Sequence, residues 1–84
     1  MTTEHPHRTW AIRSGQDFGR TIADLRHQRG MTQEELARQG AISRNYLARL
    51  ETGLTVALLD RVLRLLRRLG AEVTVTVRNS NGNA

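Results

Sequence analysis

Residues 33–51 hold a group of side chains suited to contacting nucleic acid. With Gln33 as its first position, the segment fits two short helices crossing at roughly 90–120°, with Ala37 as the small residue where they approach closely. Apolar residues occupy the inward positions: Leu36, Ile42, Leu47 and Leu50. The opposite face of the second helix carries Arg44, Asn45, Tyr46 and Arg49. Arginine and asparagine read guanine and adenine edges in the major groove, so this pattern predicts a DNA-binding helix-turn-helix.

Both helices of this unit carry start signals. Thr32 is expected to cap the first, with Glu35 completing a capping box, and Ser43 is expected to cap the second. Gly53 follows as a left-handed stop. The alternative is an ordinary helical hairpin with polar outer faces. Such a hairpin would not require the small residue, the caps and the apolar positions all to match the helix-turn-helix pattern.

Two further helices are expected around this pair. The first runs from a Ser14 cap, with Asp17 as its partner, to Arg29 and Gly30. Its buried stripe is expected to be Phe18, Ile22 and Leu25. The last runs from a Thr55 cap to Gly70, and its broad apolar face is expected to form core. That face contains Leu58, Leu59, Val62, Leu65, Leu66 and Leu69, with Val56 and Leu63 beside it. The other flank carries Arg61, Arg64 and Arg68, which are expected either to face solvent or to contact phosphates or carboxylates.

Residues 72–78, EVTVTVR, alternate strictly between valine and polar residues, which is typical of a strand. No second convincing strand is evident, and a lone strand leaves its backbone groups unpaired. We therefore expect the strand to pair with its copy in a homodimer. The expected dimerisation residues are Val56, Leu63, Val73, Val75 and Val77. The alternative is a strand that folds back on the segment around Trp10 within one chain.

Composition limits the classes of function. The 84 residues make one domain, with a net charge of +5 that favours a polyanionic partner. All thirteen basic residues are arginine, and cysteine is absent. No signal peptide or membrane-spanning run is evident, so we expect a cytoplasmic protein. No cofactor, metal site or catalytic constellation is expected. His5 and His7 could bind metal but are expected to be solvated bystanders.

The expected organisation has three parts. Residues 1–8 are expected to form a mobile arm, because they lack apolar periodicity. Residues 9–78 are expected to form the DNA-binding domain, ending in the strand 72–78. The small polar residues 79–84 are expected to be a mobile tail.

With these parts in order, the chain resembles the Xre/Cro helix-turn-helix family. The segments LRHQRGMTQEELA and ISRNYLARLETG match that family broadly, and the ending VLRLLRRLGAEVTVTV is most like the HipB-type antitoxins. The resemblance implies a mainly α fold, a lambda-repressor-like domain of four to five helices with one C-terminal strand that pairs across a homodimer. It also implies a phosphate contact for Gln33, base contacts for Arg44, Asn45 and Arg49, and a structural ion pair between Arg26 and Glu51. The expected DNA contacts are therefore Gln33, Ser43, Arg44, Asn45, Tyr46 and Arg49.

One departure from the family concerns the turn between the two helices. The family usually places an apolar residue before a glycine, whereas this chain has Gly40 followed by Ala41. Alanine in a left-handed conformation costs on the order of 1 kcal/mol relative to glycine. Either the turn shifts by one residue to use Gly40, or Ala41 is strained.

The resemblance implies an autorepressing antitoxin that binds a palindromic operator in double-stranded DNA and a HipA-like kinase toxin. A stand-alone Xre-type or phage-type repressor without a toxin is the alternative. A third hypothesis, a protein-interaction module that has lost DNA binding, predicts acidic or bulky apolar residues where Arg44, Asn45 and Arg49 stand.

Overall fold

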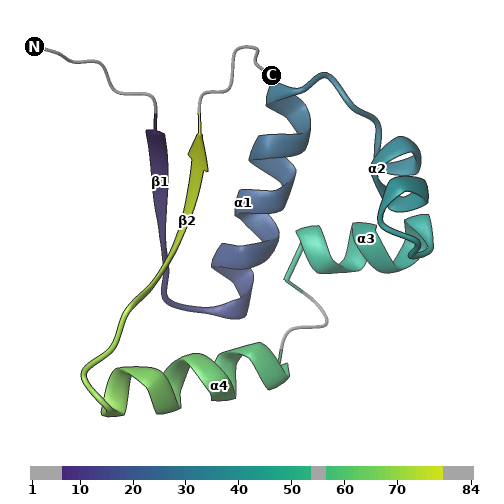
Figure 1. The fold of residues 1–84 in the computed structure, drawn as a ribbon. Helices are drawn as coiled ribbons and strands as arrows, with labels where there is room; N and C mark the ends of the chain where they lie inside the picture. Colours follow the sequence, from purple (N-terminus) through teal and green to yellow (C-terminus); the bar gives the residue numbers. More distant parts are fainter. Residues whose placement is uncertain (1–6, 54–56, 79–84) are drawn as a thin grey trace, which may run out of the picture.

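In the part of the chain that the structure describes, the fold combines four helices with a two-stranded sheet (Figure 1). The computed structural model describes residues 7–53 and 57–78. In chain order the elements are β1 (His7–Ile12), α1 (Gly15–Gln28), α2 (Gln33–Gln39), α3 (Arg44–Glu51), α4 (Ala57–Arg68) and β2 (Val73–Arg78). This confirms the prediction of a mainly helical domain with a C-terminal strand.

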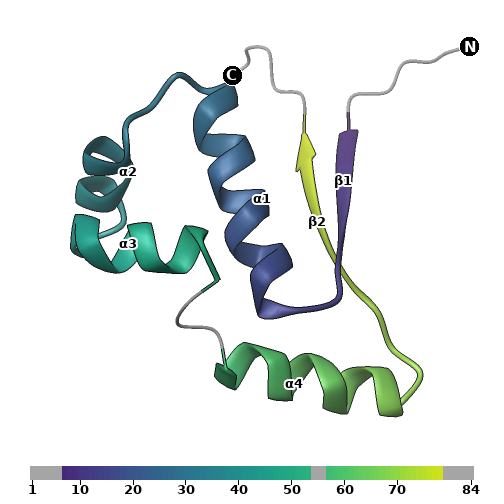
Figure 2. The same cartoon turned by 180° about the vertical axis from the view of Figure 1, so that it is seen from behind.

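Helix α1 is the centre of the arrangement. It lies between the sheet and the α2–α3 pair, and α4 crosses below it near its N-terminal end (Figures 1 and 2). It packs against β1, α3 and α4. The molecule measures only 17 Å along its shortest axis, against 39 and 36 Å along the other two. The elements therefore form a thin slab around α1 rather than a closed globule.

The helix boundaries follow the local capping signals. The Ser14 hydroxyl accepts a hydrogen bond from the backbone N of Asp17, and the Thr32–Glu35 capping box is complete. The Ser43 hydroxyl accepts from the backbone N of Tyr46. The three expected stop glycines, at positions 30, 53 and 70, all have positive φ. The expected Thr55 cap lies outside the described residues.

The C-terminal strand has a partner in its own chain, so the expectation that the chain holds no second strand to pair with it is wrong. β2 pairs antiparallel with β1, and the register places Trp10 opposite Val75 and Ile12 opposite Val73. Residues 7 and 8, expected in the mobile arm, belong to β1. The guanidinium of Arg8 donates a hydrogen bond to the side chain of Gln28 at 2.7 Å, which fixes β1 to the end of α1. The alternative, folding back on the Trp10 segment, is the one confirmed.

The buried face of α4 also differs from the expected one. Leu63 is 3% exposed, whereas Leu58 is 71%, Leu65 65% and Leu69 80% exposed. Two polar contacts accompany this orientation of α4. Asp60 and Arg67, on the same face as Leu63, bind the chain at the start of α1.

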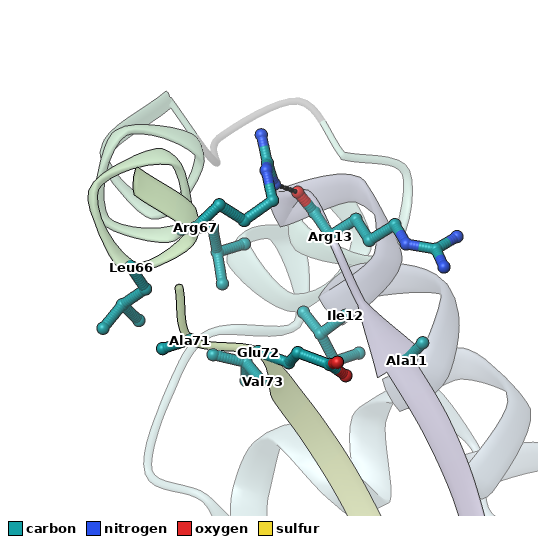
Figure 3. Close-up of a pocket in the computed structure, with 9 residues that line it drawn as sticks. Ala11, Ile12, Arg13, Leu66, Arg67, Ala71, Glu72 and Val73 are labelled. Atoms are coloured by element: carbon teal, nitrogen blue, oxygen red, sulfur yellow. Dashed lines mark hydrogen bonds between the residues drawn. The ribbon is translucent and has the colours of Figure 1, made fainter. Parts of the chain in front are cut away.

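These two polar contacts fix the rotation of α4. The Asp60 carboxylate accepts from the backbone N of Gly15 at 2.6 Å, which satisfies one of the free donors at the N-terminus of α1. The Arg67 guanidinium donates to the carbonyl of Arg13 at 2.6 Å (Figure 3). With Leu63 buried and Asp60 and Arg67 bound to the chain at the start of α1, the face centred on Val62 and Leu65 must turn outward.

Candidate nucleic-acid interface

Helix α3 presents the expected recognition side chains to solvent. Arg44, Asn45 and Arg49 are exposed, and Tyr46 is 47% exposed. On the other side of the helix, Leu47 is only 2% exposed. The eight residues of α3 span about 12 Å. The structure thus brings these four side chains together on one short, exposed helix whose opposite face is buried.

The α2–α3 turn holds α3 at a fixed angle to α2. Ala37 is 2% exposed, and its carbonyl accepts from the backbone N of Ile42 at 3.0 Å. Gly40 has a φ of −89°, whereas Ala41 has a φ of 59°. The strained alternative for the turn is therefore the observed one. Ile42, which was expected to pack inward, is 38% exposed.

The crossing of α1 and α3 depends on a residue that the sequence interpretation missed. A Cβ atom at Gly19 would overlap the carbonyl oxygen of Leu50, so no other residue fits without moving a helix. A signal was available, because glycine inside a helix costs about 1 kcal/mol relative to alanine and needs a packing reason. Asp60 and Arg67 were missed as well, and their separation in sequence from α1 leaves no local signal.

The end of the recognition helix is tied to α1 and α2 by one polar cluster. The Glu51 carboxylate accepts from Nε and Nη2 of Arg26, at 2.8 and 3.0 Å, and from Nε2 of Gln33 at 2.9 Å. The side chains of Arg26 and Glu51 are only 9% and 6% exposed. The Arg26 guanidinium also donates to the carbonyl of Met31 at 2.9 Å. The geometry agrees with the expected Arg26–Glu51 ion pair and adds Gln33 to it.

The charge states of this cluster follow from its contacts. Burial alone would raise the pKa of Glu51, but hydrogen bonds from Arg26 and Gln33 and the positive charges of Arg26 and His27 outweigh it. The pKa of Glu51 is therefore lowered. The hydrogen bond and charge of Glu51 raise the pKa of Arg26, against the opposing effect of its burial. The pair is ionised at neutral pH, so α3 is held by charge-assisted hydrogen bonds.

Gln33 and Ser43 use part of their hydrogen-bonding capacity within the fold. Gln33 is half-buried and gives one N–H to Glu51. An amide group has two N–H donors, so one remains for a phosphate. Ser43 is exposed, and its oxygen accepts from the backbone N of Tyr46 at 2.9 Å, which leaves its O–H free to donate.

The expected dimerisation residues do not gather into one exposed face. Leu63 is buried in its own chain, and Val56 lies outside the described residues. Val73, Val75 and Val77 are half-buried on a sheet whose strands pair with each other. On one flank of α4, Arg61, Arg64 and Arg68 are exposed.

Among residues 7–53 and 57–78, no group of three His, Cys, Asp or Glu side chains is placed to hold a metal ion. Within the same ranges, no helix has the length and apolar character needed to cross a membrane.

Comparison with known proteins agrees with this geometry. The model of the helix-turn-helix domain family matches residues 17–78, from the first turn of α1 to the end of β2. Neither the curated proteins nor the solved structures gave a match. The matched range includes α2, α3, α4 and all but the first two residues of α1, together with the turn at Gly40–Ala41 and every expected DNA contact. Such a domain indicates a DNA-binding regulator, and the chain belongs to the helix-turn-helix domain family.

Proposed function

We propose that this chain is a sequence-specific repressor of transcription, and that it is the autoregulating antitoxin of a HipA-like kinase toxin. The observation that carries the proposal is the exposed row Arg44, Asn45 and Arg49 on a helix with a buried back. Exposed arginines alone would suit any polyanion. A row that includes asparagine suits the reading of base edges, because asparagine can pair with adenine. The helix that carries it is held by the α2–α3 turn at its start and by the contacts of Glu51 at its end.

In the proposed complex α3 enters the major groove with its first turn toward the bases. Arg44 and Arg49 are suited to guanine O6 and N7, and Asn45 to adenine N6 and N7. Ser43 and the free N–H of Gln33 are suited to phosphate oxygens, which position the protein without selecting sequence. The contacts of Gln33 and Arg26 with Glu51 would then connect the phosphate contact to the placement of the recognition helix.

We further propose that the repressor acts as a homodimer on a palindromic operator in double-stranded DNA. Two recognition helices would then contact successive major-groove turns about 34 Å apart. The antitoxin assignment is supported by the resemblance of residues 62–77 to HipB-type endings. The proposed role is non-catalytic, needs no cofactor and belongs in the cytoplasm.

The test is a selection against fragments of the source genome, followed by gel shifts on the recovered sequence. Arg44→Ala and Asn45→Ala should each weaken specific binding by about 1–3 kcal/mol and relax the preference for one base pair. Gln33→Ala should weaken all sequences about equally. Arg61→Ala, which removes the same charge from α4, should leave base preference unchanged. If Arg44→Ala and Asn45→Ala leave specific affinity unchanged, α3 is not the reading helix.

The proposed DNA contacts also predict a steep dependence on salt. If the dimer neutralises about 6–10 phosphates, affinity should fall by roughly 10³–10⁵ between 50 and 200 mM salt. A flat response would assign the excess of arginine to a protein partner instead.

The antitoxin assignment has its own test. The product of the adjacent gene should carry kinase motifs, should co-purify with this chain and should lose its toxicity when the chain is co-expressed. If no such gene exists but the operator is bound, the chain is a stand-alone repressor.

A further inference from the structure

A cavity of about 290 Å³, here called the α4–sheet cavity, lies where α4 meets the end of β1 and the start of β2. Its lining includes two of the most deeply buried side chains among the described residues, Ile12 and Leu63, each 3% exposed. The half-buried Leu66, Ala71 and Val73 continue this apolar lining. Since a water molecule occupies about 30 Å³ in the liquid, the cavity has the volume of roughly ten waters. That volume suits a small organic molecule.

Two side chains of opposite charge face the α4–sheet cavity. Figure 3 shows the guanidinium of Arg67 above it and the carboxylate of Glu72 below it, reaching from the start of β2 toward β1. Arg13 also contributes to the lining, but its side chain points away from the cavity in the same view. In the part of the chain that the structure describes, Glu72 forms no ion pair with either arginine. The two charges therefore face one space without neutralising each other.

Both charged groups can bind a ligand. Arg67 donates to the carbonyl of Arg13 at 2.6 Å, and this bond holds its guanidinium at the rim of the cavity. A guanidinium has five N–H donors in one plane, so donors remain for a carboxylate, which fits their fork geometry. Glu72 is exposed, and its carboxylate can accept hydrogen bonds from an ammonium group.

We propose that the α4–sheet cavity binds a free aliphatic amino acid. The carboxylate of the ligand lies on Arg67, its ammonium group lies on Glu72, and its side chain packs on the apolar lining. An apolar pocket with a few convergent polar groups is the common form of a small-molecule site. The inference does not rest on the proposed function, and it adds a small-molecule ligand to the DNA partner.

Ligands of other charge match the cavity less well. An amine without a carboxylate would place its positive charge near Arg67, and a carboxylic acid without an amine would place its negative charge near Glu72. A purely apolar molecule would cover both charged groups and return no hydrogen bond to either, which costs their desolvation. A zwitterion with an apolar side chain meets all three parts of the lining.

The position of the cavity gives binding a structural consequence. Its lining comes from α4, β1, β2 and the segments next to them, so a ligand contacts all three elements only when they are folded together. Such a ligand stabilises the fold by mass action. The sheet and the α2–α3 pair lie on opposite sides of α1 (Figures 1 and 2), so the bound amino acid leaves α3 open to DNA.

The experiment is a titration of the full, isotopically labelled chain, followed by proton–nitrogen correlation NMR. L-Leucine is compared with isopentylamine, which lacks its carboxylate, and with isocaproate, which lacks its amine. Leucine should bind at millimolar concentration and shift the backbone amides of Ile12, Ala71 and Val73, while the amides of α3 stay in place. Each singly charged analogue should bind roughly 10-fold more weakly or worse, because one charged hydrogen bond is lost.

The titration can overturn the proposal without any variant. No shift at the three amides, shifts that gather on another surface, or an analogue that binds as tightly as leucine would each do so. Because the comparison uses the unaltered chain, the result does not depend on whether a substituted chain folds.

Glu72→Gln tests the assignment of the ammonium group. It should bind leucine roughly 10-fold more weakly, because the ammonium group loses its charged partner, and it should bind isocaproate at least as tightly as the parent does. The matched control is Glu34→Gln, at an exposed position of α2, which should leave both affinities unchanged. Equal affinity of the two variants for leucine, or a loss of isocaproate binding in Glu72→Gln, would refute the assigned role.

Failure of this proposal is distinguishable from failure of the proposed function. Arg44→Ala should lose specific DNA binding and keep its affinity for leucine, whereas Glu72→Gln should lose affinity for leucine and keep its affinity for the operator. A chain that binds leucine but no genomic fragment would refute the repressor function and leave the cavity site standing.

Discussion

Replacing Glu51 by alanine should detach the recognition helix from the rest of the domain. The carboxylate accepts three hydrogen bonds from Arg26 and Gln33, and its side chain is 6% exposed. After the substitution the Arg26 guanidinium, 9% exposed, keeps its bond to the carbonyl of Met31 but has no counter-charge in this cluster. Removing one partner of such a pair costs about 3–5 kcal/mol.

That loss is large for a chain of this size. Domains of 84 residues are stable by roughly 4–13 kcal/mol, and each kcal/mol lowers the melting temperature by about 4–8 °C. We therefore expect Glu51→Ala to melt at least about 12 °C below the parent, by circular dichroism at pH 7. Glu34→Ala, which removes an exposed carboxylate from α2, should melt within about 2 °C of the parent.

A double substitution distinguishes the loss of the ion pair from the loss of side-chain volume at position 51. Arg26→Met combined with Glu51→Leu removes both charges, and it should recover much of the stability lost in Glu51→Ala. The reasoning is refuted if Glu51→Ala melts within about 2 °C of the parent, because the cluster then contributes nothing measurable.

Three other predictions concern the same packing. Because the pKa of Glu51 is lowered, its ionised form stabilises the fold at every pH above 4.5, the usual pKa of a glutamate. This stabilisation is lost as the pH falls through the lowered pKa. Glu51→Gln lacks the titrating group, so its melting temperature should fall less steeply below pH 4.5 than that of the parent. Gly19→Ala should lower the free energy of unfolding by about 1–3 kcal/mol in urea titrations and weaken operator binding, because the new Cβ must push Leu50 away. The control is Gly40→Ala, whose Cβ meets its nearest atom at 3.5 Å and which should be nearly neutral. Equal stability of the two variants would contradict the close crossing of α1 and α3. Ala41→Gly should raise the free energy of unfolding by about 1 kcal/mol, because glycine has no Cβ to be strained at a φ of 59°. An unchanged or lower melting temperature would argue against strain in the turn.

The features predictable from the sequence are those encoded within a few residues. Ser14, Thr32 and Ser43 each cap a helix through a backbone N–H three positions later, so their roles follow from local spacing. The exposed row on α3 is likewise a matter of helical periodicity. The position of Glu51 beside Arg26 was expected only because the chain resembles a family in which that pair occurs.

The features that were missed depend on contacts between distant parts of the chain. Asp60 binds the backbone of Gly15, forty-five positions away, and that bond decides which side of α4 faces inward. Hydrophobic periodicity indicated a broad apolar arc on this helix but could not say which part of it the chain itself would bury. β1 was expected only as the alternative partner of the C-terminal strand, because its alternation is weak, with Ala11 on the face opposite Trp10 and Ile12, and its partner follows only after the four helices.

The pairing of β1 with β2 also determines when folding can be completed. The two strands lie more than sixty positions apart, and the four helices are made between them. Contacts of such separation form late and slowly, because a long loop must close before they stabilise anything. The residues of all four helices are therefore made before those of β2, and the sheet can form only afterwards. Closure of the sheet places Val75 opposite Trp10, the single tryptophan, so we expect the fluorescence of Trp10 in a refolding experiment to report a late step of folding rather than an early one.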